Sequence, residues 1–130
     1  TPTTPYAIRL SLVGSEMCIR DRETGECKMD PNFLHTIQEI RNVFGPMSIS
    51  SGYRSPDHSI EKRKNKPGAH ATGMACDVRV YGESAWRLLR IAANLPEIRG
   101  IGVSQKGDPQ KRFIHLDILS GPNRPWVWSY

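Results

Sequence analysis

Two short stretches of the sequence carry residue types that bind catalytic metals. Gly68–Val80, GAHATGMACDVRV, contains His70 and Asp77, and Phe113–Ile118, FIHLDI, contains His115. Two histidines and one carboxylate are a common ligand set for a catalytic zinc ion, whose fourth position stays open to water. The first pair alone is a weak signal, but buried polar groups on a second stretch are costly unless they are paired. We therefore expect all three side chains to converge on Zn2+ in a metal-dependent hydrolase.

The two stretches have the alternating pattern of β-strands. In Met74–Tyr81 the period of two places Asp77 on the face opposite to the apolar residues. In Arg112–Leu119 it places His115 and Asp117 together on one face and apolar residues on the other. The apolar faces belong in a core, so the polar faces are predicted to form the site.

The remaining elements are predicted from caps, breakers and spacing. Asp30 and Pro31 begin a helix that ends at Gly45. Within it, His35 is predicted to lie at the surface. Residues 83–95 are predicted to form a second helix, and residues 47–50, 100–105 and 124–130 are predicted to form strands. The alternative for residues 124–130 is a wall of the substrate cleft. This order predicts an α+β fold with a small, mostly antiparallel sheet and flanking helices.

Composition limits the class of protein. The chain has 130 residues, with 38% hydrophobic and 24% charged residues, which suits one globular domain. The formal net charge is +5, and a basic surface suits nucleic acid, anionic lipid or an acidic polymer such as a bacterial wall. The basic run Glu61–Lys66 is predicted to be a solvated loop, with no nucleic-acid motif around it. No apolar run is long enough to span a bilayer. Three cysteines without a CxxC pair predict neither a disulfide framework nor a cysteine zinc site.

The first 22 residues differ in character from the rest. Ser11–Arg22, SLVGSEMCIRDR, resembles the translation of a transposon-type sequencing-library adapter, and back-translation of Leu12–Asp21 reproduces adapter sequence. The alternative is a genuine N-terminal arm. We predict that residues 1–22 are not native and that residues 23–130 form the domain.

Three motifs together carry a family resemblance. SGYRSP, GAHATGMACD and RFIHLD resemble the zinc peptidases of the D-alanyl-D-alanine carboxypeptidase type, peptidase family M15, over about residues 29–130. The resemblance is strongest to small phage and prophage members. It implies that His70, Asp77 and His115 are the zinc ligands and that Arg54 binds the carboxylate or carbonyl of the substrate. The hedgehog signalling domain shares the scaffold and the metal site, so fold alone does not settle activity.

Two positions depart from the family pattern. Gly68 replaces a serine, and Arg112 stands where several members place an acidic general base, three residues before the last histidine. Arginine cannot accept a proton, so Asp117 is the substitute candidate for the base. Its alternative role is to support His115 as a hydrogen-bond partner. Asp108, in the preceding turn, is a more distant candidate.

The resemblance implies metal-assisted amide hydrolysis. We expect a zinc peptidase acting on peptidoglycan stem peptides, as a carboxypeptidase or an endopeptidase. We expect its partners to be peptidoglycan peptides and the protein to be a monomer. The competing hypothesis is a zinc-binding structural or interaction module of the same fold that has lost catalysis.

Overall fold

The computed structural model describes residues 29–51 and 73–130. The described elements are two α-helices, one short 3-10 helix and five strands: α2 (Pro31–Phe44), β1 (Ile49–Ser51), β2 (Ala75–Arg79), α4 (Gly82–Ala93), β3 (Gly100–Ser104), η2 (Pro109–Lys111), β4 (Phe113–Asp117) and β5 (Trp126–Ser129). Arg54, Gly68, His70, the run Glu61–Lys66 and residues 1–22 lie outside the described residues.

Helix α2 begins where its capping sequence predicts. The Asp30 carboxylate accepts hydrogen bonds from the backbone N–H groups of Asn32 and Phe33, at 2.8 and 3.1 Å. These are two of the N–H groups that a helix leaves without an internal partner, and Pro31 has none to lose. The helix ends at Phe44, and Gly45 follows with a φ of 102°, which favours glycine.

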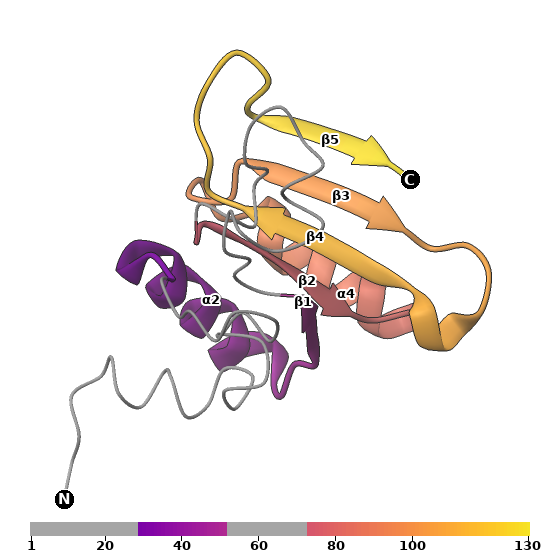
Figure 1. Ribbon diagram of the computed structural model, residues 1–130. Helices are drawn as coiled ribbons and strands as arrows, with labels where there is room; N and C mark the ends of the chain where they lie inside the picture. Colours follow the sequence, from indigo (N-terminus) through magenta and orange to yellow (C-terminus); the bar gives the residue numbers. More distant parts are fainter. Residues whose placement is uncertain (1–28, 52–72) are drawn as a thin grey trace, which may run out of the picture.

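The five strands form one sheet in the order β1-β2-β4-β3-β5 (Figure 1). Strand β4 therefore lies at the centre, between β2 and β3, and both pairings are antiparallel. The β1 pairing is antiparallel as well, whereas β5 runs parallel to β3 along the far edge. The sheet is thus mostly antiparallel, as predicted, and the C-terminal segment is a strand.

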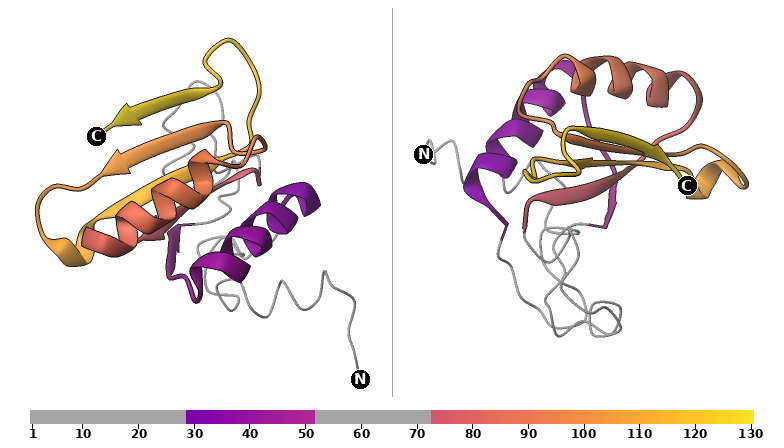
Figure 2. Two further views of the ribbon diagram at one scale, coloured as in Figure 1. Left: turned by 180° about the vertical axis from the view of Figure 1, so that it is seen from behind. Right: turned by 90° about the horizontal axis from the view of Figure 1, so that it is seen from above.

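Both helices cover the same face of the sheet, as Figure 2 shows in the view from above. Their buried side chains form one core with the inward residues of the strands: Phe33, Ile37, Ile40, Ala85, Leu88, Ala92, Cys76, Val78, Ile114 and Leu116. The α+β fold class is therefore confirmed. Because alternate residues of a strand point to opposite faces, this core commits the odd-numbered residues of β2 and β4 to the other face.

The predicted surface position of His35 is also confirmed. His35 is exposed on α2, where it pairs with Glu39 one turn later at 3.3 Å. Cys76 is buried in the core. Within residues 29–51 and 73–130, neither helix has the length and apolar character needed to cross a membrane.

Candidate metal centre

Asp77 and His115 meet on the face of the sheet that the helices leave uncovered. They are direct partners in the β2–β4 ladder, so their side chains rise next to each other. The Asp77 Oδ1 atom lies 3.1 Å from His115 Nδ1. The His115 side chain is almost completely buried, and that of Asp77 retains 17% of its exposure. The two residues thus present an oxygen and a nitrogen to the same small space.

The other ring nitrogen of His115 also faces a carboxylate. His115 Nε2 lies 2.7 Å from Oδ2 of Asp117, two residues along the same strand. A neutral imidazole carries only one N–H, so it can donate to only one of these two carboxylates. Burial lowers the pKa of His115, but the hydrogen bonds with Asp117 and Asp77 outweigh it, and the pKa is raised above its usual value. Nδ1 therefore needs either a proton or another cation between itself and Asp77.

Asp117 is fully buried and its two oxygens are occupied. Oδ2 faces His115 and accepts from Arg124 Nη2 at 2.8 Å. Oδ1 accepts from Arg124 Nε at 3.0 Å and from the backbone N–H of Leu119 at 3.2 Å. Burial alone would raise the pKa of Asp117, but the hydrogen bonds from His115 and Arg124 hold it at about 2. This carboxylate stays ionised and holds protons weakly.

Arg124 is a site residue that the sequence interpretation missed. Its guanidinium grips both oxygens of Asp117, the two-pronged geometry in which arginine binds carboxylates most strongly. The contact also raises the pKa of Arg124. A sequence signal did exist, because a strand that buries an aspartate needs a nearby cation. That signal could not single out Arg124, since the chain carries 18 lysines and arginines.

Asp77 Oδ1 and His115 Nδ1 have the chemistry and the spacing of two of the ligand atoms of a zinc site. Ligand atoms about 2.0–2.1 Å from a tetrahedral zinc ion lie about 3.3 Å apart, close to the 3.1 Å between Asp77 Oδ1 and His115 Nδ1. Asp77 and His115 supply two donors. In the described part of the chain no group of three or more histidine, cysteine, aspartate or glutamate residues is arranged to hold a metal. The third predicted ligand, His70, and the predicted substrate-binding residue, Arg54, lie outside that part.

The other two positions considered for the general base, Arg112 and Asp108, make contacts away from His115. Arg112 donates from Nε and Nη2 to the backbone carbonyl of Gly107, at 3.1 and 2.8 Å, and so braces the turn before β4. The Asp108 side chain accepts from the backbone N–H of Gln110 at 2.9 Å and caps η2. Both stabilise the connection between β3 and β4.

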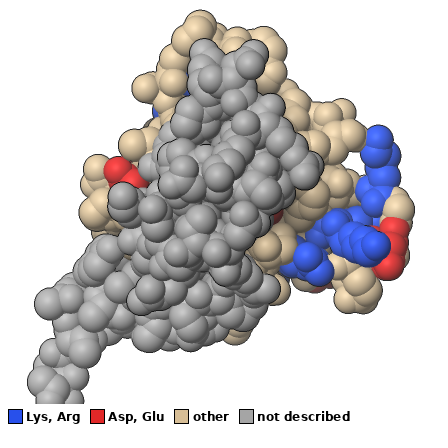
Figure 3. All heavy atoms as spheres, viewed as in Figure 1, with Lys and Arg blue, Asp and Glu red and all other residues tan. Residues whose placement is uncertain are grey.

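That connection is the most basic part of the surface in view. Lysine and arginine side chains gather at the end of the molecule where β3 turns into β4 (Figure 3). Lys106, Lys111 and Arg112 come from this connection. None of the three forms a salt bridge with another described residue. Asp108 is the acidic residue of this connection, so this end carries a net positive charge, which suits an acidic polymer.

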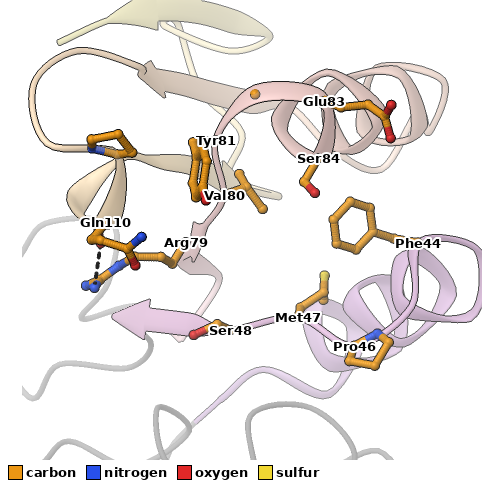
Figure 4. Close-up of a pocket in the computed structure, with 12 residues that line it drawn as sticks. Phe44, Pro46, Met47, Ser48, Arg79, Val80, Tyr81, Glu83, Ser84 and Gln110 are labelled. Atoms are coloured by element: carbon orange, nitrogen blue, oxygen red, sulfur yellow. Dashed lines mark hydrogen bonds between the residues drawn. The ribbon is translucent and has the colours of Figure 1, made fainter.

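A cavity of about 650 Å³ lies beyond the end of β2 (Figure 4). Phe44 and Met47 form one side, and Arg79, Tyr81 and Gln110 form the other. Arg79 Nη1 donates to the backbone carbonyl of Gln110 at 2.9 Å across this side. The residues that line the cavity do not include those around His115, so it is separate from the candidate metal centre.

Comparison with known proteins places the chain among peptidases. The family model described as Peptidase M15 matches residues 9–117, which include His70, Asp77 and His115. The match begins inside residues 1–22, whose foreign origin stays a prediction. No solved structure matches.

The curated relatives that match this chain are also peptidases by name. The peptidoglycan L,D-endopeptidase MepK of Escherichia coli (strain K12) and the protein of the same name from Shigella flexneri are each 28% identical to this chain over 116 residues. The aligned residues cover 82% of this chain and 60% of each relative, so the chain spans about 60% of the length of these proteins. Because the family match extends over most of the sequence, the chain belongs to the peptidase M15 family.

Proposed function

We propose that this protein is a zinc-dependent peptidase that hydrolyses bonds in peptidoglycan stem peptides, of the carboxypeptidase or endopeptidase type. Family membership and the MepK relatives support a peptidase directed at the wall. The observation that carries the zinc requirement is the placement of His115 between two carboxylates.

Asp117 and Arg124 favour the tautomer of His115 that carries its proton on Nε2. The ionised Asp117 accepts a hydrogen bond from Nε2–H, and in the neutral imidazole this leaves the Nδ1 lone pair directed at the Asp77 oxygen. Two lone pairs 3.1 Å apart repel each other unless a proton or a metal cation lies between them. A carboxylate behind a metal-binding histidine is the usual way to set its tautomer and raise its basicity. This arrangement favours a divalent cation held by Asp77, His115 and the predicted third ligand His70.

Each residue then has a defined task. When bound, zinc supplies an activated water at neutral pH and polarises the scissile carbonyl. Asp77, His115 and His70 hold the ion, and Asp117 orients His115. Arg54 pairs with a carboxylate or carbonyl of the peptide, as its two-pronged geometry allows. The pKa of about 2 and the occupied oxygens of Asp117 favour this supporting role over that of general base, because an efficient base has a pKa near the working pH.

The test is digestion of purified peptidoglycan with added zinc or with chelator, with the products identified by mass spectrometry. We expect zinc-dependent release of stem-peptide fragments, whose masses identify the bond. His115→Ala and His70→Ala should lose both zinc and activity. His35→Ala is the matched control, because His35 is exposed on α2. Full zinc content in the His70 and His115 variants would overturn the ligand assignment.

A second candidate is a metal-binding module without hydrolytic activity. The specific observation in its favour is that Arg112 occupies the position of the family's acidic base, while Asp117 is already committed to Arg124. Stoichiometric zinc with no cleavage of any wall peptide would select this candidate.

A further inference from the structure

The wall beside His115 is formed by an aromatic side chain from the far edge of the sheet. Gly102 of β3 is the ladder partner of His115 on one side and of Trp128 on the other. The indole of Trp128 reaches across β3, and its ring centroid lies 5.2 Å from that of His115, with a 50° angle between the planes. Trp128 thus contacts a predicted ligand from two strands away.

This reach depends on the absence of a side chain at Gly102. A Cβ atom placed there would lie 2.6 Å from both Nε1 and Cε2 of Trp128. Such contacts are well inside van der Waals distance, and the indole is a rigid ring that cannot bend away. Any other residue at position 102 would therefore displace the Trp128 indole from its place over β3 and move it away from His115.

The four side chains around this point form a closed ring of contacts. The Arg124 guanidinium carbon lies 5.0 Å from the Trp128 ring centroid, within the range of a cation–π interaction. Arg124 grips Asp117, Asp117 binds His115, and His115 contacts Trp128. These contacts hold the imidazole at Nε2 and place the Trp128 indole beside it.

We propose that Trp128 is a positioning residue for His115, and that Gly102 is required because it makes room for it. The contacts at Nε2 and Nδ1 hold the two nitrogens of the imidazole, but they still allow the ring to tilt about the line that joins these nitrogens. The indole removes this freedom, so Nδ1 keeps its aim at the Asp77 side of the site. Trp128 acts through His115 and not on the substrate. The consequence for metal binding rests on the proposed function; the effect on the His115 ring does not.

The variants are Trp128→Ala, Trp128→Phe and Gly102→Ala, with Trp126→Ala as the matched control. Trp126 is the same residue type on the same strand, and 56% of it is exposed. We expect Trp128→Ala and Gly102→Ala each to weaken zinc binding by about tenfold or more, as loss of a ligand's support does. Trp128→Phe should retain most of the affinity, and Trp126→Ala all of it.

The decisive test is the double variant. If Gly102→Ala acts by displacing Trp128, it should cost little further affinity once Trp128 is already alanine. Equal and additive losses in the two backgrounds would overturn the proposal. With active protein, kcat should fall while KM stays within about twofold, because the substrate is not contacted.

A metal-free readout separates this proposal from the proposed function. In chelator, the His115 ring protons of the wild type should show a ring-current shift in NMR spectra. Trp128→Ala and Gly102→Ala should remove this shift, and Trp126→Ala should not. Unchanged His115 resonances in Trp128→Ala would overturn the proposal even if the enzyme is active. Loss of the shift would support it even if no wall peptide is cleaved.

Discussion

Replacing Asp117 by asparagine separates its two candidate roles. The substitution keeps the volume but removes the charge and turns one oxygen into an amide donor. Arg124 donates to both oxygens of Asp117, so the new NH2 group faces the guanidinium in either orientation. At least one charged hydrogen bond is lost, which costs about 1.5–3 kcal/mol. His115 also loses its anionic partner at Nε2.

The two roles predict different effects on zinc affinity and on the rate of hydrolysis. Loss of support should weaken zinc binding by about 10- to 100-fold, or about 1.4–2.7 kcal/mol. Loss of a general base should leave zinc binding intact and lower the rate by about 10²- to 10⁴-fold. We expect the first result, with activity largely restored at saturating zinc.

The assay is zinc competition against a calibrated chelator, followed by peptidoglycan hydrolysis at several zinc concentrations. Asp108→Asn is the control, because Asp108 is exposed and caps η2. It should change neither quantity. Unchanged zinc affinity in Asp117→Asn together with abolished hydrolysis would refute the supporting role.

Four further predictions concern stability. In chelator, stability should fall as pH drops from about 4 to about 2, because the pKa of Asp117 is lowered from 3.8 to about 2 on folding; the loss is about 2 kcal/mol, and denaturant melts of Asp117→Asn should lack it. Because the pKa of His115 is raised, its contribution is complete below about pH 6.5 and disappears as pH rises through the raised value; a rise in metal-free stability over that range would contradict this. A Cβ atom at Gly100 would overlap the Asp117 carboxylate, so Gly100→Ala should lower the melting temperature, whereas Gly107→Ala, where no atom is within 4 Å, tests backbone strain alone. Deletion of residues 1–22 should leave the melting temperature unchanged; a lower one would mean that the segment belongs to the domain.

The sequence predicts the local structure around His115 well because that structure is periodic. Alternation in β2 and β4 places Asp77 and His115 on the uncovered face, and each stretch carries this signal by itself. Helix α2 is likewise set by its own cap at Asp30.

The supporting residues could not be predicted in the same way, because their contacts depend on the order of the strands. Trp128 reaches His115 only since β5 pairs with β3, in parallel, and β3 pairs with β4. Arg124 lies in the connection that leads to β5, and neither spacing nor residue type reveals that connection's path. Gly102 resembles any other strand glycine until its two neighbours are known.

The central position of β4 has a consequence for the proposed metal site. Edge strands fray most easily, whereas a middle strand opens only when the ladders on both sides have broken. His115 is anchored on such a middle strand. Its backbone amide should therefore exchange with solvent deuterium only through global unfolding. Release of the ion by distortion of this strand would then require the whole domain to come apart.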